Sequence, residues 1–381
     1  MGYILNDEQK DVVALAKEFA DKEVAPLVKE YDISGEPPME LYQKAFDMGL
    51  HALEIPEEYG GSGMDYYTVA AVYEELAKVD AGFATGVAAT GLGLKPVLMA
   101  GTDEQKKYFA EYILGTRGNC FGAFALTEPD AGSDASAGKT VAEKVGDEYI
   151  INGRKCFITN AGLASIYVVF AITDKSKGTK GISAFIVERD REGVSVGKEE
   201  DKMGIRLSNT ADVVFDNVHI PADHLLGREG QGFALAMKTL DLARPMVAAM
   251  AVGVAQRALE EATAYAKQRV TFGKPIIRHQ VIQFKLADMD IKAEMARAGI
   301  INALNNYYAG IPYGREAAIA KCYAGDIAVE CALEGIQILG GYGYSREYPV
   351  EKLLRDAKIM QIYEGTNEIQ RVVVAGYVAA R

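Results

Sequence analysis

The spacing of apolar residues changes twice along this chain, and the two changes divide it into three parts. Up to about residue 110, apolar residues recur every three or four positions, as they do on the buried face of a helix. Between about residues 120 and 226, short runs rich in β-branched and aromatic residues replace this pattern, and from Gly232 the helical spacing returns. We therefore predict an N-terminal all-α domain at 1–118, a middle β domain at 119–228 and a C-terminal helical domain at 229–381.

Local signals place elements within the first two parts. Asn6, with Gln9 three residues later, predicts a capping box at the start of the first helix. The strand-forming run Tyr149–Ile151 leads into Asn152-Gly153, a dipeptide that predicts a hairpin turn. Further strands are expected at 166–172, 182–187, 194–196 and 213–220. Because turn signals and no long helix separate them, the pattern favours an antiparallel sandwich or small barrel over a parallel sheet.

The last part predicts long, alanine-rich helices. The expected segments are 233–270, 282–309, 315–339 and 350–379. Four long helices of this kind favour a four-helix bundle.

Composition argues against several classes of protein. The net charge of −12 disfavours a nucleic-acid-binding surface, because phosphate contacts need clustered Lys and Arg. No signal peptide is visible, and no apolar stretch approaches the length that spans a bilayer. The four cysteines form no Cys-x-x-Cys pair, which indicates reduced thiols and a cytoplasmic protein. The four histidines form no ligand-spaced cluster with them, so we expect no metal site.

The segment QIYEGTNEIQR, at 361–371, contains the strongest candidate for chemistry. Glu364 precedes Gly365, which lets the main chain come close to a ligand, and Thr366, whose hydroxyl can bind a polar group. A glutamate that abstracts a proton must stand close to its substrate. Taken alone, a glutamate beside a glycine is more often a solvated turn residue. The assignment of Glu364 therefore depends on the other motifs of the chain.

Those motifs occur in order along the whole chain. They are PEEYGG at 56–61, LTEPDAGSD at 126–134, KCFITN at 155–160, RVTFGKPI at 269–276, QILGGYGY at 337–344, YPVEKLLRDAK at 348–358 and IYEGTNEIQR at 362–371. With them the chain resembles, essentially from end to end, the acyl-CoA dehydrogenases of short- or medium-chain type. The resemblance implies a helical N-terminal domain, a central β domain and a C-terminal four-helix bundle. It also implies FAD, an acyl-CoA substrate, an electron-transferring flavoprotein as partner and a homotetramer.

The resemblance also assigns a reaction to Glu364. This residue would abstract the α-proton of the thioester, while its own backbone N–H and a ribityl hydroxyl of the flavin hold the thioester carbonyl. The β-hydrogen would leave as hydride to flavin N5. Some relatives carry their base on the helix that contains TLDLARP, but the corresponding residue here is Ala243, which cannot accept a proton.

Contacts with cofactor and substrate carry over by position. The residues expected to bind FAD are Phe124, Leu126, Thr127, Ser133, Phe157, Ile158, Thr159, Arg269, Thr271, Phe272, Gln280, Gln337, Gly340, Gly341, Thr366 and Glu368. Among these, Gln337, Gly340 and Gly341 are expected to reach the FAD of a neighbouring subunit. The residues expected to bind substrate are Ser133, Asp241, Arg244, Tyr363 and Gly365, with Asp241 and Arg244 at the adenine and phosphate end of CoA.

Several alternatives stay open. The small residues from Gly86 to Gly91 fall where relatives line the acyl tail, which suggests a pocket for more than four carbons or for a branched or cyclic group. They equally permit close packing of helices. The reaction could run as dehydrogenation or as reduction of an enoyl-CoA. Two other functions are an acyl-CoA oxidase, which generally has an extra C-terminal domain, and a non-enzymatic acyl-CoA- or flavin-binding scaffold, which predicts loss of the base.

Overall fold

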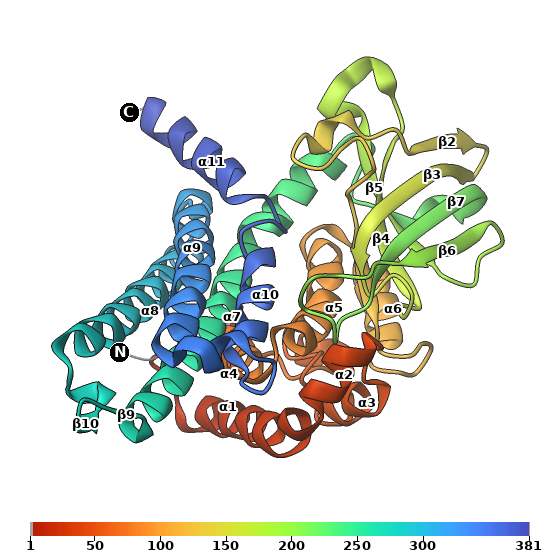
Figure 1. Ribbon diagram of the computed structural model, residues 1–381. Helices are drawn as coiled ribbons and strands as arrows, with labels where there is room; N and C mark the ends of the chain where they lie inside the picture. The colour runs from red at the N-terminus through yellow and green to blue at the C-terminus, as the bar shows by residue number, and fades with distance from the viewer. Residues whose placement is uncertain (1–2, 381) are drawn as a thin grey trace.

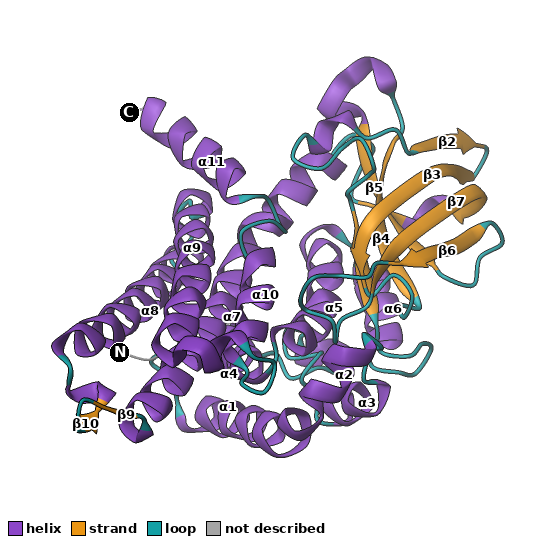
Figure 2. Cartoon of the chain, in the orientation of Figure 1, coloured by secondary structure: helices purple, strands orange, loops and turns teal. Residues whose placement is uncertain are grey.

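The computed structural model describes residues 3–380, and its helices and strands occupy separate regions (Figure 1, Figure 2). The helices are α1 Asp7–Phe19, α2 Val28–Ser34, α3 Met39–Asp47, α4 Tyr66–Val79, α5 Ala81–Ala100, α6 Asp103–Ile113, α7 Gly232–Gln268, α8 Gln280–Tyr308, α9 Gly314–Leu339, α10 Val350–Ile359 and α11 Asn367–Ala379. The strands are β1 Gly122–Ala125, β2 Val141–Val145, β3 Glu148–Thr159, β4 Ile166–Ile172, β5 Ile182–Glu188, β6 Val194–Glu199, β7 Thr210–Pro221, β8 Leu225–Leu226, β9 Val270–Thr271 and β10 Lys274–Pro275. The predicted order of helical, β and helical parts is confirmed.

The first helix starts at the predicted capping box. The Asn6 side chain accepts a hydrogen bond from the Gln9 backbone N–H at 2.9 Å, and the Gln9 side chain accepts one from the Asn6 backbone N–H at 2.8 Å. These bonds satisfy two of the backbone donors that a helix start leaves free.

Helix α5 contradicts the expectation that no apolar stretch of the chain approaches the length that spans a bilayer. By length and composition this 20-residue helix could cross a membrane, but 72% of its apolar window is buried inside the protein. Its glycines allow neighbouring groups to pack against the helix backbone. At Gly86, for example, the Cβ of any other residue would lie 1.9 Å from the Tyr42 hydroxyl, which is too close to fit. A helix surrounded by other helices needs an apolar surface on all sides, as a membrane span does.

The sheet has the order β6-β7-β3-β2-β4-β5-β8, with β1 paired to β4. Its pairings are antiparallel except those of β1 and β2 with β4. The hairpin turn expected at Asn152-Gly153 does not form, because this dipeptide lies inside β3, which pairs with β2 on one edge and β7 on the other. Gly153 instead allows a close approach, since a Cβ there would lie 2.4 Å from the Thr140 hydroxyl.

The C-terminal bundle differs from expectation at its last helix. The segment predicted as one helix at 350–379 forms two, α10 and α11, with a turn between them. The backbone is left-handed at Glu364 (φ 52°) and Gly365 (φ 90°), which ends helical geometry. The Thr366 side chain then accepts a hydrogen bond from the Ile369 N–H and caps α11. The break presents Glu364 on a turn, on the side of the bundle nearer the sheet (Figure 1).

Candidate active site

The turn that carries Glu364 is held by α9. Lys321, on α9, is fully buried, and its Nζ donates hydrogen bonds to the Gly365 carbonyl at 2.7 Å and to the Asn367 side chain at 3.1 Å. On the other side of the turn, Gln370 Nε2 donates to the carbonyls of Gly365 at 2.9 Å and Glu364 at 3.2 Å. The carbonyls that the left-handed turn leaves outside a helix are therefore satisfied by side chains.

A second residue of α9 anchors both flanks of the turn. The Asp326 carboxylate accepts hydrogen bonds from Gln361 Nε2 and Asn367 Nδ2, each at 2.8 Å. It also accepts one from Arg371 at 2.7 Å. Three residues around the turn thus converge on one carboxylate, which fixes the position of the segment relative to α9.

The Glu364 carboxyl group is buried and unpartnered. Part of the residue reaches the surface, but its Oε2 is buried and has no hydrogen-bond partner within residues 3–380. Burial raises the pKa of Glu364 to about 7, although the positive charges of Lys95, Lys321 and Arg244 lower it. A buried carboxyl with a free oxygen and a pKa near neutrality can exchange a proton with a ligand.

Arg244 lies beside this carboxyl group. Its side chain is 4% exposed, donates a hydrogen bond to Asp241, and keeps a buried Nε without a partner among the described residues. Its charge lowers the pKa of Glu364, whereas the resemblance implied a place at the adenine and phosphate end of CoA. The neighbouring Tyr363 is half-buried, with its hydroxyl 3.0 Å from Met360 Sδ, and burial raises its pKa.

One group of the residues expected to bind FAD gathers at the end of β1 and the second half of β3. The Cys156 N–H donates to the Thr127 carbonyl at 2.9 Å, which joins the two segments. The buried Lys155 Nζ donates to the Leu126 carbonyl at 3.0 Å and to Glu128 at 2.7 Å. Phe124, Leu126, Thr127 and Thr159 are half-buried beside them, and Ser133 is exposed on the loop that follows.

Phe157 is the most unusual residue of this group. Its ring is 65% exposed, and its backbone is left-handed (φ 54°), at an irregularity in the pairing of β3 with β7 between Lys155 and Ile158. Left-handed backbone at a bulky residue is costly and is typical of binding sites. An exposed ring held this way fits the face of a flat, apolar group. Ile158 is 2% exposed, so its side chain is not available to a ligand.

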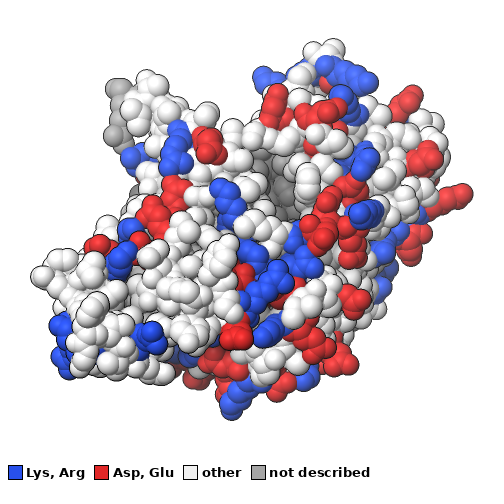
Figure 3. Space-filling model, in the orientation of Figure 1, with Lys and Arg blue, Asp and Glu red and all other residues white. Residues whose placement is uncertain are grey.

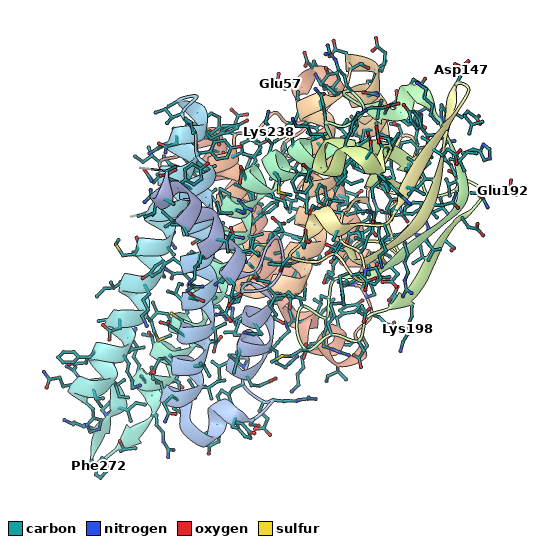
Figure 4. All side chains as sticks on the ribbon, turned by 90° about the horizontal axis from the view of Figure 1, so that it is seen from above. Glu57, Asp147, Glu192, Lys198, Lys238 and Phe272 are labelled. Atoms are coloured by element: carbon teal, nitrogen blue, oxygen red, sulfur yellow. The ribbon has the colours of Figure 1, made fainter. Side chains whose placement is uncertain are left out.

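The remaining residues expected to bind FAD lie elsewhere. Arg269, Thr271, Phe272 and Gln280 surround the β9–β10 hairpin, and Gln337, Gly340 and Gly341 lie where α9 ends. The two subsets are neighbours, since the rings of Tyr265, near the end of α7, and Tyr342 are 6.3 Å apart. Phe272 is 96% exposed and points away from the sheet (Figure 4). Within one chain, the β9–β10 hairpin lies on the far side of the molecule from the sheet that contains β3 (Figure 1). Thr366 and Glu368 lie at the start of α11, beside the Glu364 turn.

The surface is hollowed between α11 and the sheet, next to the turn that carries Glu364 (Figure 3). The segment between α10 and α11, which carries Glu364, lies at the edge of this hollow (Figure 1).

Sequence reasoning missed two lysines near Glu364. Lys95 forms a buried ion pair with Glu54, with 2.5 Å between Nζ and Oε1, and the two side chains are 2% and 3% exposed. Lys321 stands on the alanine-rich, buried face of α9. A signal existed for both, because Lys95 is the single charged residue of α5 and Lys321 interrupts a run of small residues. Lysine in such a position is rarely buried without a partner.

Comparison with known proteins agrees along the whole chain. Three family models match: the N-terminal domain of acyl-CoA dehydrogenase at 6–115, the middle domain at 123–218 and the C-terminal domain at 230–378. The short-chain-specific acyl-CoA dehydrogenase of Megasphaera elsdenii is 49% identical and covers 99% of each chain. The structure of butyryl-CoA dehydrogenase from Megasphaera elsdenii has a TM-score of 0.95 at 48% identity, over 100% of both chains. A chain in the structure of the electron transferring flavoprotein of Acidaminococcus fermentans has a TM-score of 0.96 at 45% identity, again over 100% of both.

Proposed function

The chain belongs to the acyl-CoA dehydrogenase family, which uses FAD, and on this premise we propose that it interconverts an acyl-CoA and its trans-2-enoyl-CoA with Glu364 as the base. The observation that carries the proposal is the buried, unpartnered Oε2 of Glu364 together with a pKa of about 7. A base that takes a proton from a weak carbon acid works best when its pKa lies near the working pH.

The residues of the chain suggest how the acyl-CoA is activated. Glu364 would take the α-proton, and its backbone N–H, which lies outside both α10 and α11, would donate to the thioester carbonyl. A donor aimed at a developing oxyanion typically contributes about 3–4 kcal/mol to transition-state stabilisation. Arg244 and Asp241 would contact substrate close to the reacting end, since Arg244 is buried beside Glu364. Tyr363, Gly365 and Ser133 stay candidates for further substrate contacts.

The exposed ring of Phe157 supports a flavin site at the end of β1 and β3, where Leu126, Thr127 and Thr159 offer further contacts. When bound, FAD supplies the acceptor for the β-hydride. We propose that the residues around β9–β10 and the end of α9 serve the adenosine half of FAD across a subunit boundary, in a homotetramer. The place of the β9–β10 hairpin, on the far side of the chain from the sheet, supports this arrangement (Figure 1). The electron partner we propose is an electron-transferring flavoprotein, and the compartment is the cytoplasm.

The acyl group we propose is a short one. The glycines that suggested a deep pocket have neighbours already, since a Cβ on Gly91 would lie 2.9 Å from Glu54 Oε1 and a Cβ on Gly86 would meet Tyr42. These positions therefore favour the packing explanation. Tyr42 is fully buried and donates to the Leu207 carbonyl at 3.0 Å, so it has no freedom to move aside for a longer chain.

An anaerobic visible spectrum tests the proposal. We expect the purified protein to show a flavin spectrum that bleaches with butyryl-CoA, more slowly with hexanoyl-CoA, and least with cyclohexanecarbonyl-CoA. A bound flavin that no acyl-CoA bleaches would contradict the proposed reaction, and a protein that cannot be loaded with FAD would contradict the cofactor site. Rapid reoxidation by air after bleaching would favour the oxidase alternative.

The rate of flavin reduction is expected to depend on pH with an apparent pKa of about 7. Only the ionised carboxylate of Glu364 can accept the α-proton, and its pKa is raised to about 7 in the folded protein. At pH 6 about one tenth of the protein would carry the active form, so kcat/KM should fall roughly tenfold per pH unit below neutrality. Stopped-flow reduction between pH 5.5 and 9 measures this profile. A rate that stays constant from pH 5.5 to 7 would exclude Glu364 as the titrating base.

A further inference from the structure

The buried cation Lys321 has no carboxylate within contact distance among the described residues. Its side chain is fully buried, and it bonds to two neutral oxygens, those of the Gly365 carbonyl and the Asn367 side chain. Within residues 3–380 it forms no contact ion pair. Burying an ammonium group is costly unless negative charge lies nearby. The negative charge that acts on it most strongly is Glu364.

Three cations from three helices face Glu364, and the other two are already paired. Lys95 on α5 is in contact with Glu54, and Arg244 on α7 is in contact with Asp241. Lys321 on α9 is therefore the cation whose charge is left for Glu364. The other titratable groups that face the carboxyl are Tyr73 on α4 and the adjacent Tyr363, both neutral at physiological pH.

We propose that Lys321 is a positioning residue for Glu364: its two hydrogen bonds hold the left-handed turn in place, and its charge stabilises the carboxylate form of the base. The inference rests on the proposed role of Glu364. It assigns two separable functions to one side chain, since the bonds act on the backbone of the turn and the charge acts on the carboxyl.

The direction of each pKa agrees with this pairing. Burial lowers the pKa of Lys321 to about 8, while the Glu364 charge raises it, and burial raises the pKa of Glu364 to about 7, while the Lys321 charge lowers it. Both groups are therefore charged between about pH 7 and 8. Without the Lys321 charge, less would oppose the effect of burial on Glu364. The pKa of Glu364 would therefore rise, and its carboxyl group would be harder to ionise.

The test compares Lys321→Met with Asp326→Asn in the FAD-loaded protein. Lys321→Met removes the bonds and the charge with little change of volume. Asp326→Asn weakens the anchors of Gln361, Asn367 and Arg371 on the same helix but removes no cation that faces Glu364. Titration of the carboxyl C=O infrared band, assigned by subtracting the Glu364→Gln spectrum, reports the ionisation of Glu364 without substrate. Stopped-flow reduction reports the maximal rate.

We expect Lys321→Met to raise the midpoint of the Glu364 infrared titration by about 1 pH unit and to lower the maximal rate of flavin reduction. Asp326→Asn should lower the maximal rate and shift the midpoint less than Lys321→Met does, because the Asp326 charge acts on Lys321 and the Lys321 cation stays in place. The charge role is overturned when Lys321→Met titrates like the wild type, or when both variants shift equally. The anchoring role is overturned when Lys321→Met keeps the full maximal rate.

Lys321→Arg keeps the test decisive should Lys321→Met fail to fold. Arginine retains the cation in a different shape, so the midpoint should stay near that of the wild type while the maximal rate falls. A midpoint raised as far as about 1 pH unit in this variant would overturn the proposal. The infrared titration needs no turnover, so failure of the proposed reaction would show separately, as a wild-type flavin that no acyl-CoA reduces.

Discussion

Replacement of Glu364 by glutamine is expected to slow flavin reduction by butyryl-CoA by at least about 10³-fold, because the amide cannot accept the α-proton. The substitution should leave the fold intact. Glutamine has nearly the same volume, and the environment already favours the neutral carboxyl, whose pKa is raised to about 7 by burial. Flavin content and the thermal unfolding midpoint should therefore match those of the wild type. Anaerobic stopped-flow mixing with butyryl-CoA measures the loss.

The matched control for this experiment is Glu347→Gln. Glu347 is exposed in the loop that precedes α10 and makes its described bond through its backbone, to Ser345. We expect the same charge change there to leave the rate within about twofold, since exposed substitutions away from a site rarely perturb it. A Glu364→Gln protein that bleaches as fast as this control would move the base to another residue and remove the basis of the proposed mechanism.

The sequence predicted the fold well where one period continues through an element. The strand expected at 166–172 has the observed bounds of β4, and the capping box at Asn6 forms as expected. Prediction failed where local and long-range signals disagree. Asn152-Gly153 has the local preference of a turn, but hydrogen bonding on both edges of β3 keeps it extended. The helix predicted at 350–379 also ran through residues 360–366, although Gly365 and the N-cap residue Thr366 mark the left-handed turn that divides it.

The proposed base could be identified from the sequence, but the groups that surround it could not. Glu364 became a candidate because its own motif occurs together with the other motifs of the family, in order along the chain. The groups that act on its ionisation, Lys95, Arg244 and Lys321, come from three helices and meet only after folding. The resemblance placed Asp241 and Arg244 at the adenine and phosphate end of CoA, whereas their spacing alone is that of a surface ion pair. The burial of Arg244 could not be inferred from this spacing.

Lys352 is another charged residue whose burial its spacing in the sequence does not reveal, and its contacts lead to a prediction about the stability of the protein. This residue, on α10, is 8% exposed, and its Nζ lies 2.5 Å from both Asp80 Oδ2 and Asp356 Oδ2. The two carboxylates have structural roles of their own. Asp80 caps α5 by accepting from the Phe83 N–H at 2.7 Å, and Asp356 accepts from the Ile205 N–H at 2.6 Å. The ammonium group therefore joins α10 to the start of α5, and it neutralises the carboxylate that holds the loop before β7.

Lys352→Met is expected to lower the free energy of unfolding by about 3–5 kcal/mol, because it leaves two buried carboxylates side by side without a cation. Burial already raises the pKa of Asp356 while the Lys352 charge lowers it, so loss of Lys352 would raise this pKa further above the unfolded value. A raised carboxyl pKa contributes stability at low pH that is lost as pH rises through the folded pKa. The loss should therefore be larger at pH 8 than at pH 5.

Denaturant unfolding at one fixed protein concentration, followed at both pH values, measures this effect. Lys358→Met on the same helix is the control, since Lys358 is exposed and its side chain bonds only to that of Gln361 among the described residues, at 2.8 Å. Its effect should stay within about 0.5 kcal/mol and should not vary with pH. Equal losses for the two variants would mean that the Lys352 cluster is solvated in the folded protein. A larger loss for Lys352→Met that is the same at both pH values would mean that lost packing, and not uncompensated charge, is the cause.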